Sequence, residues 1–232
     1  MAGLVGMALL AVSACAQDGA TSPETVRELA GSAEAVSTRE QVEQGIRKTV
    51  DHWDAHTALT LGLVTLDDSC VGGKAEEWFF QDGDDEYEIR CTMYVSAYFG
   101  ADPRRMPDTI DGILTAGDPE NSPIPFGHDF IYATKVVDYY RGRTGDPQGP
   151  GTGEPRELFS AGTVTLDWDQ VRRSGTRQLI EEVPSCAPGV PPVKRCLREP
   201  ASAGVATLRR EYGMVFKLVF PSSNYFTVYK DD

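Results

Sequence analysis

The chain has 232 residues, with 35 acidic and 22 basic side chains, so its formal net charge at pH 7 is −13. This acid excess argues against nucleic acid as a partner, because binding to phosphates needs a basic face. Hydrophobic residues make up 41% of the chain, enough to bury a core. No stretch after the first 15 residues reaches the roughly 20 apolar residues that cross a bilayer.

A short apolar stretch near the N-terminus ends at a cysteine. Residues 3–12 are almost all apolar and small, and Cys15 precedes the first charged residue, Asp18. This length suits the hydrophobic region of a signal peptide and is too short for a transmembrane helix. The residues Val12-Ser13-Ala14-Cys15 resemble a bacterial lipobox, which has a branched apolar residue, two small residues and a cysteine. The resemblance covers this motif and indicates no fold family.

The lipobox resemblance implies how the chain is processed and where it lies. Cys15 would receive a diacylglyceryl group on its sulfur, and residues 1–14 would be removed as the signal peptide. Two or three acyl chains anchor a protein stably, because each buried methylene contributes about 0.8 kcal/mol. We therefore expect a lipoprotein at the extracytoplasmic face of the cell membrane, and its excess of arginine over lysine resembles actinobacterial usage. The alternative is a soluble protein with a fortuitous N-terminal cysteine.

The other four cysteines form an even set in a chain that we expect to be exported. An oxidising compartment favours disulfides, so two bonds are predicted among Cys70, Cys91, Cys186 and Cys196. Three connectivities are possible, and proximity favours Cys70 with Cys91 and Cys186 with Cys196. The alternative is a tetrahedral metal site made by all four thiolates, although the sequence has no CxxC pair.

A tether and then a helix are predicted after Cys15. Residues 15–37 are mostly small and polar, which is typical of a tether that lifts a domain off a membrane. Within it, Ser22-Pro23-Glu24 offers a helix start and Gly31-Ser32 a break, so the tether is expected to be partly helical. Thr38-Arg39-Glu40-Gln41 has the form of a capping box. The apolar residues that follow recur at helical spacing: Val42, Ile46, Val50 and Trp53. This pattern predicts a helix over residues 39–54.

Period-two alternation replaces helical spacing after residue 58. Leu59, Leu61 and Leu63 alternate with smaller or polar residues. The clearest strand runs over residues 86–95, where one face carries apolar side chains and the other is mainly polar. Asp82-Gly83, just before it, suits a hairpin turn. The order indicates an α+β fold, with an N-terminal helix followed by an antiparallel β-meander.

The remaining elements predict a C-terminal half that is mostly β. Residues 101–128 are rich in turn formers, with one or two helical turns after Pro107, and Phe130 to Tyr140 has the β-branched and aromatic content of a strand. Thr163 to Trp168 alternates again. The chain ends in a predicted hairpin, in which Pro221 to Asn224 form the turn between two strands.

Residues 38–232 are thus predicted to form a single α+β domain. The segment 142–155 is dense in glycine and proline, which is typical either of a long surface loop or of a boundary between two halves. Both interpretations remain open from the sequence alone.

Two of the three histidines are four residues apart. His52 and His56 would lie on the same side of the predicted helix and could bind one metal ion. His128 could complete the set of ligands. The motif lacks the glutamate that follows the first histidine in zinc proteases and acts as their general base. The alternative is a partly exposed helix end beside a core tryptophan, Trp53.

Clustered carboxylates and aromatics each allow two interpretations. Residues 82–86 are acidic enough for calcium but lack EF-hand spacing, so a solvated turn is preferred, and Asp67-Asp68 and 118–120 are interpreted in the same way. Some aromatics would form a ligand surface if they were exposed together: Tyr94, Tyr98, and Tyr225 or Phe226. A second buried face of the sheet is the alternative.

No nucleophile or phosphate-binding motif occurs in the sequence. We therefore expect a non-catalytic envelope lipoprotein that binds an envelope partner or a small ligand and needs no cofactor, with the membrane as a partner through the lipid on Cys15. The alternative is a metal-dependent envelope hydrolase that uses His52 and His56.

Overall fold

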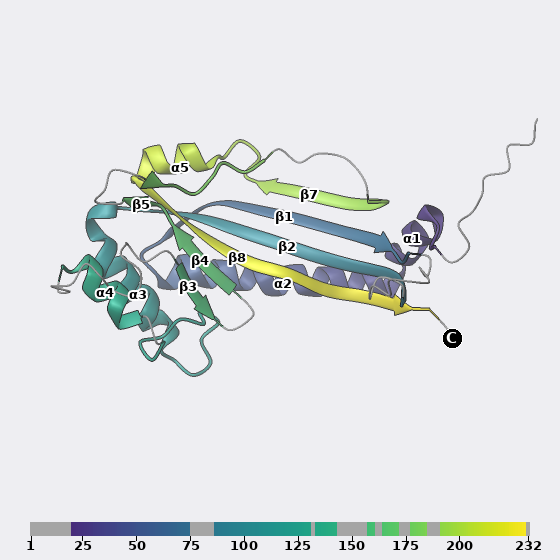
Figure 1. The fold of residues 1–232 in the computed structure, drawn as a ribbon, viewed down its shortest axis with the longest axis horizontal. Coiled ribbons are helices and arrows are strands. Elements are labelled where there is room, and N and C mark those ends of the chain that lie inside the picture. Colours follow the sequence, from purple (N-terminus) through teal and green to yellow (C-terminus); the bar gives the residue numbers. More distant parts are fainter. Residues whose placement is uncertain are drawn as a thin grey trace, which may run out of the picture.

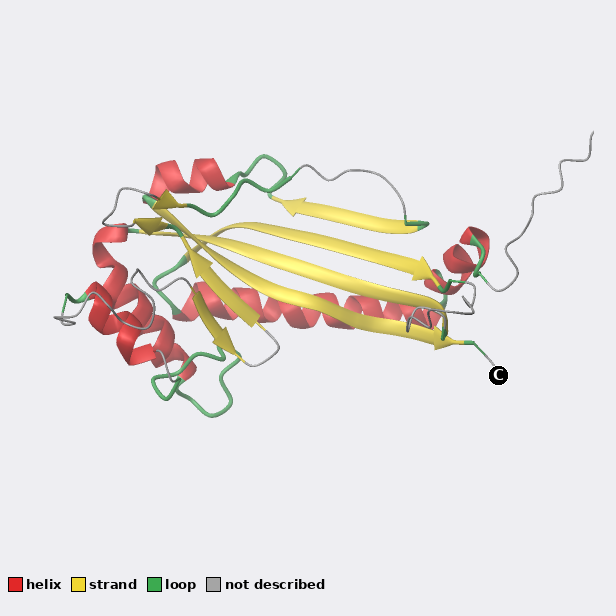
Figure 2. Cartoon of the chain, in the orientation of Figure 1, coloured by secondary structure: helices red, strands yellow, loops and turns green. Residues whose placement is uncertain are grey.

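The structure is a computed structural model that describes residues 20–74, 86–130, 133–142, 157–160, 164–171, 177–184 and 191–230. Its fold is α+β, as predicted: two helices come first, and a six-stranded antiparallel sheet follows in the order β3-β4-β8-β2-β1-β7 (Figure 1). Figure 2 shows the longest helix running along this sheet. Residues 1–14 and Cys15, which carry the predicted lipobox, lie outside the described residues. In the part of the chain that is described, no helix has both the length and the apolar character to span a membrane.

Two helices precede the sheet, α1 (Pro23–Ala30) and α2 (Ala33–His56). A serine side chain caps each helix, because Ser22 accepts a hydrogen bond from Thr25 N and Ser32 accepts one from Ala35 N. Capping satisfies amide groups that have no partner within the helix. These serines therefore fix where both helices begin.

The prediction of a tether over residues 15–37 is wrong from residue 20 onward, although the helix start predicted at Ser22-Pro23-Glu24 and the break at Gly31-Ser32 are confirmed. Val26 and Ala30 of α1 are buried in the main core, and Thr21 N donates to Gly73 O beside β1. Val26 and Ala30 are four residues apart, so they lie on one side of α1 and bury that side. The folded domain thus begins well before residue 38.

The predicted start of the long helix at residue 39 is also wrong. Thr38 lies inside α2, where its Oγ1 donates to Glu34 O instead of capping the helix. Inside a helix, serine and threonine side chains can instead donate to the carbonyl four residues earlier. The capping-box pattern at Thr38 was therefore a false start signal, and Ser32 is the cap.

The strands β1 (Thr60–Gly72) and β2 (Tyr87–Ala101) form the centre of the sheet. The predicted inward face of β2 is confirmed, because five alternating side chains are buried: Tyr87, Ile89, Cys91, Met93 and Val95. In β1 the predicted alternation fails at Gly62, where the register against β2 shifts. The predicted turn at Asp82-Gly83 lies outside the described residues.

Strands from the C-terminal half flank this central pair. β8 (Met214–Tyr229) pairs with β2, and β7 (Val193–Glu199) pairs with β1. β4 (Val164–Trp168) adds to β8, and β3 (Glu157–Ser160) adds to β4. The sheet is therefore not a simple meander. Strands from both sides of the predicted boundary at 142–155 lie in this one sheet, while most of the 142–155 segment is outside the described residues.

Two helices replace other predicted structure. α3 (Met106–Gly117) has 12 residues, where one or two turns were predicted, and α4 (Ala133–Tyr140) is a helix, where a strand was predicted. In α4, Ala133, Val136 and Val137 are all buried. Their spacing of three and four residues places them on one side of a helix, and this burial outweighs the strand propensity of the segment.

The predicted terminal hairpin is a single strand. β8 runs for 16 residues through Pro221 to Asn224, and its register against β2 shifts between Cys91 and Thr92 and between Met93 and Val95. Irregularities of this kind absorb a proline and turn-forming residues without reversing the chain. β4, by contrast, matches its prediction, with Val164, Leu166 and Trp168 buried.

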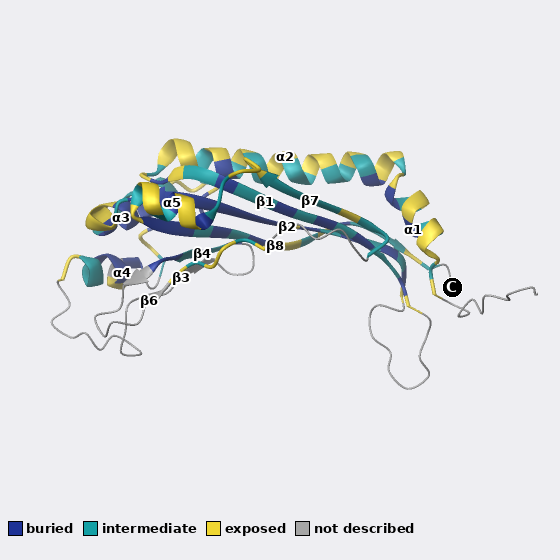
Figure 3. Ribbon diagram, turned by 90° about the horizontal axis from the view of Figure 1, so that it is seen from above, coloured by how far each residue is buried: buried dark blue, intermediate teal, exposed yellow. Residues whose placement is uncertain are grey.

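The main core lies between the sheet and α2, which covers one face along its length (Figure 3). Trp53 of α2 contacts Phe99 of β2 and Phe126, with ring centroids 6.4 and 6.0 Å apart. Successive residues of a strand face opposite sides, so Tyr98 points away from α2. It packs with Leu63 and with residues of α5 (Val205–Tyr212) in a second, smaller cluster.

α5 lies close to the sheet because two glycines leave room for it. A Cβ on Gly62 would be 1.9 Å from Leu208 Cδ2, and a Cβ on Gly100 would be 2.2 Å from Tyr212 Cδ2. A side chain at either position would displace Leu208 or Tyr212 of α5 from its place against the sheet. The two glycines thus determine how closely α5 and its apolar cluster pack against the sheet.

A disulfide links the two central strands. Cys70 and Cys91 are directly opposite in the register of β1 and β2, and they are bonded, as proximity predicted. Cys196 in β7 is disulfide-bonded as well, and Cys186 lies outside the described residues. The bond between Cys70 and Cys91 is fully buried in the core.

Removing the Cys70–Cys91 bond is expected to lower the free energy of unfolding by about 3 kcal/mol, the loop-entropy value for a loop of this size. The two cysteines are 21 residues apart. Denaturant unfolding of a Cys70→Ala/Cys91→Ala double variant measures the effect, whereas a reductant would also attack the bond at Cys196. An unchanged midpoint would contradict the prediction and show that the unfolded chain is already constrained there.

Candidate functional site

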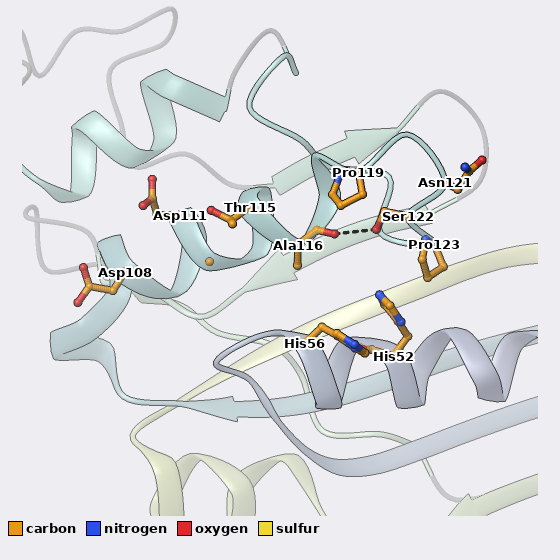
Figure 4. A pocket seen from close by; sticks show the side chains of 11 residues that line it. His52, His56, Asp108, Asp111, Thr115, Ala116, Pro119, Asn121, Ser122 and Pro123 are labelled. Carbon is orange, nitrogen blue, oxygen red and sulfur yellow. Dashed lines mark hydrogen bonds between the residues drawn. The ribbon is translucent and has the colours of Figure 1, made fainter.

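An open cleft lies between the C-terminal end of α2, the helix α3 and the turn that follows α3 (Figure 4). Its volume is about 660 Å³. Two imidazoles line it from α2, carboxylates and a threonine line it from α3, and residues 119–123 form the third wall. We call it the histidine cleft, because His52 and His56 are the imidazole side chains among its lining residues.

The two histidines of the cleft stack on each other. Their ring centroids are 3.9 Å apart and the rings are inclined by 18°. His56 Nδ1 lies 2.9 Å from His52 O, and because a carbonyl oxygen can only accept, Nδ1 carries the proton. Desolvation and the neighbouring His56 lower the pKa of His52 below its ordinary value. His52 is therefore neutral at neutral pH.

Hydrogen bonds hold the third wall of the cleft against α3. Ser122 Oγ donates to Ala116 O at 2.7 Å and accepts from Ile124 N at 3.1 Å. Gly117 lies so close to the returning chain that a Cβ there would be 1.9 Å from Phe126 O. The position of this wall is thus fixed by the close contact between the backbones at Gly117 and Phe126 and by the hydrogen bonds of Ser122.

The acidic side chains lie at the other end of the cleft. Figure 4 shows Asp108 and Asp111 on α3 pointing away from the histidine rings. Asp111 accepts from Arg141 Nη2 at 3.1 Å and faces His128 Nε2 at 3.4 Å. Asp111 is therefore part of a salt-bridge cluster at the far end of the cleft and does not complete a site with His52 and His56.

His128 is held away from the other two histidines. Its backbone N donates to Asp118 Oδ1 at 2.7 Å, and its ring Nδ1 donates to Asp118 Oδ2 at 2.8 Å. Among the described residues no group of three or more potential metal ligands occurs. The predicted set of His52, His56 and His128 is therefore not assembled, and Asp118 is a hydrogen-bonding partner as well as a turn residue.

The contribution of His128 to stability is expected to depend on pH. The pKa of His128 is raised above its ordinary value of 6.5, chiefly by the hydrogen bond to Asp118. Because the folded pKa exceeds the unfolded one, the stabilisation is fully present below pH 6.5 and is lost as pH rises through the folded pKa.

Chemical denaturation of the unmodified chain and of His128→Gln between pH 5 and 9 measures this dependence. The difference in unfolding free energy is expected to be largest at the acid end and to shrink with rising pH. His52→Gln serves as a control, since the pKa of His52 shifts in the opposite direction. A His128 difference that grows with pH would contradict the prediction.

A second polar cluster lies beneath the middle of α2, and the sequence did not reveal it. Asp68 is only 2% exposed, although it was predicted to be a solvated turn residue. Its carboxylate accepts from Tyr225 OH at 2.7 Å and pairs with Arg39 Nε at 3.0 Å. Arg195 Nε is 3.7 Å away. This cluster joins α2 to three strands.

The cluster continues along α2 toward solvent. Arg195 also pairs with Glu43, which pairs with Arg47, and Arg47 Nη1 reaches Glu199 at 2.7 Å. Desolvation and the hydrogen bond to Asp68 raise the pKa of Tyr225 to about 12. Tyr225 is therefore a neutral donor at neutral pH, and the cluster has the features of a structural connection between α2 and the sheet.

The predicted aromatic surface is not formed as a unit. Tyr94 is 39% exposed, whereas Tyr98 and Tyr225 are buried. Tyr98 lies under α5, so the alternative of a second buried face is confirmed at that end of the sheet. The acidic turn at 82–85 lies outside the described residues.

Sequence reasoning found the two histidines of the cleft but missed its α3 side. Asp108, Asp111 and Thr115 are on a helix that the prediction made too short. The spacing of four buried residues, Met106, Ile110, Ile113 and Leu114, was the available signal for that helix. Comparison of the chain with protein-family models, with curated proteins and with solved structures found no match.

Proposed function

We propose that the chain is a lipoprotein anchored through Cys15 at the extracytoplasmic face of the cell membrane, whose domain binds a small ligand in the histidine cleft without catalysis. The observation that carries the binding role is the cleft itself. Three separate segments bound it, and hydrogen bonds of Ser122 hold one of its walls in place. Clefts lined by apolar groups and a few polar ones are the usual ligand sites of proteins.

The compartment and the absence of catalysis have separate support. The buried Cys70–Cys91 bond fits an oxidising compartment, where disulfides persist. Within the described residues, three polar groups of the cleft already have structural partners: Asp111 bonds Arg141, His56 bonds the α2 backbone, and Ser122 bonds Ala116 and Ile124. This arrangement favours recognition over turnover.

Mass spectrometry of the membrane-extracted protein tests the anchor. The expected spectrum lacks residues 1–14 and carries the mass of a diacylglyceryl group, with or without an amide-linked acyl chain. A Cys15→Ser variant is expected to lose both the adduct and the membrane association. An intact N-terminus with an unmodified Cys15 would overturn the anchoring proposal.

Two matched glycine variants test the cleft. Gly112 lines the cleft on α3, and Gly45 is exposed on α2; a Cβ at either position has no atom within 4 Å. Gly112→Phe is therefore expected to fill the cleft, while Gly45→Phe makes an equal helical substitution elsewhere. Native mass spectrometry of protein released gently from the envelope should show a bound small molecule on Gly45→Phe and none on Gly112→Phe. Equal occupancy of both variants, or none in the unmodified chain, would overturn the binding proposal.

A further inference from the structure

The histidine pair in the cleft has a geometry that serves metal binding. His52 and His56 are one helical turn apart on α2, and both line the cleft (Figure 4). Residues four apart lie on the same side of a helix, with their Cβ atoms about 5–6 Å apart. Two imidazoles held in this way can both reach one ion.

The hydrogen bond of His56 prepares one ligand. Its Nδ1 donates to His52 O at 2.9 Å, which leaves the lone pair on Nε2. Histidines that bind metals usually donate their other ring nitrogen to a carbonyl or carboxylate, because this bond fixes the tautomer and the ring orientation. His56 already has such a partner in the absence of an ion.

The ring of His52 is free to complete the pair. None of the described residues hydrogen-bonds this ring, and it is half-buried at the edge of the cleft. Partly exposed side chains change rotamer on the picosecond to nanosecond scale. The ring can therefore turn from its stacked position and direct a nitrogen toward an ion held by His56.

We propose that His52 and His56 together bind one divalent transition-metal ion, with Cu²⁺ preferred over Zn²⁺, and leave the other coordination positions open to the cleft. Imidazole ligands suit copper, zinc and nickel, and copper is highest in the affinity order of the divalent first-row metals. The described residues supply no third ligand, so water or a bound molecule fills the open positions. The inference goes beyond the proposed function and requires neither the lipid nor a partner.

The test uses the untagged full chain, freed of metal with EDTA and titrated with CuCl₂ and then with ZnCl₂ in a non-coordinating buffer. Calorimetry gives stoichiometry and affinity, and electron paramagnetic resonance of the Cu²⁺ complex counts the bound imidazole nitrogens. We expect one Cu²⁺ with two nitrogen ligands. His52→Gln and His56→Gln should each bind at least about 10-fold more weakly, because each variant loses the gain from linking two ligands.

Two further variants make the result specific. Ala55→Gln changes an exposed residue of the same helical turn outside the cleft lining and should leave Cu²⁺ binding unchanged. His128→Gln should also leave it unchanged, because His128 is held by Asp118. Circular dichroism of each variant confirms that α2 is intact.

Three outcomes would overturn the proposal. The unmodified chain could show no saturable Cu²⁺ binding, or binding could persist at full affinity in His52→Gln and His56→Gln, which would place the ion on Cys15 or the terminal amine. Weakening by His128→Gln equal to that of the other two would indicate a three-histidine site instead. None of these outcomes depends on the lipid adduct or on the glycine variants.

Discussion

Replacing Asp68 by alanine is expected to lower the free energy of unfolding by about 3 to 5 kcal/mol, the usual cost of removing one partner from a buried ion pair. Asp68 is 2% exposed and lies in β1, facing α2. Its loss leaves the Arg39 guanidinium, also largely buried, without its carboxylate. The Tyr225 hydroxyl loses its acceptor at the same time. The large effect thus comes from polar groups left unpaired more than from the contacts removed.

Two variants separate charge from hydrogen bonding at this cluster. Asp68→Asn keeps the shape and one acceptor oxygen but removes the charge that faces Arg39 and Arg195. It should be less destabilising than Asp68→Ala. Tyr225→Phe removes one hydroxyl and should cost only about 1 kcal/mol, the net value of an ordinary hydrogen bond. Equilibrium unfolding in urea, with circular dichroism as the probe, measures all three variants.

A small loss for Asp68→Ala, no greater than that for Tyr225→Phe, would contradict this account. It would show that water enters beneath α2 and solvates Arg39, or that Arg39 moves to another carboxylate. Glu40 is such a group, because its charge already acts on Arg39. Adding Glu40→Gln, a change at an exposed residue, to Asp68→Ala would distinguish these two explanations, since only the second predicts a further loss.

The Asp68 cluster shows why part of this fold was predictable and part was not. Strands β2 and β4 were predicted correctly because their burial follows an unbroken period of two along a few residues. Asp68 breaks the apolar pattern at an inward position between Leu66 and Cys70. Its partners are supplied by α2, β7 and β8, far away in sequence, so the local pattern resembled a solvated acidic pair.

The histidine cleft likewise has one part that the sequence predicts and another that it does not. His52 and His56 were identified because helical spacing of four residues is a local property. The wall opposite them depends on α3 and on the close approach of Gly117 to Phe126, which only the folded backbone creates. His128 was grouped with the other histidines by residue type alone, and its binding to Asp118 could not be inferred without the turn that joins them.

Replacing Asp169 by alanine should destabilise the opposite side of the sheet by a similar amount, about 3 to 5 kcal/mol. Asp169 follows β4 and is 3% exposed. Its carboxylate accepts two bonds from Arg209 of α5, at 2.7 and 2.8 Å. It also accepts from Ile180 N at 2.8 Å and from Val215 N, at the start of β8, at 2.9 Å. One side chain therefore satisfies donors from three separate segments.

Glu182 provides the matched control for Asp169. It also accepts two backbone amides of α5, Val205 N and Ala206 N, and it pairs with Arg198, but its side chain is 48% exposed. Water can replace an exposed acceptor, so Glu182→Ala should cost only about 1 kcal/mol, as for the loss of a helix cap. The pair of variants thus compares one set of interactions in a buried and in an exposed setting.

Hydrogen exchange locates the effect of Asp169→Ala in the structure. Faster exchange is expected in α5 and at Met214 to Phe216, because Arg209 no longer holds α5 against the end of β8. Exchange in α2 should change only to the extent that global stability falls, since the main core lies on the other face of the sheet. Unchanged α5 exchange, or a loss no larger than that of Glu182→Ala, would show that the two glycines and the apolar cluster under α5 are sufficient to hold it.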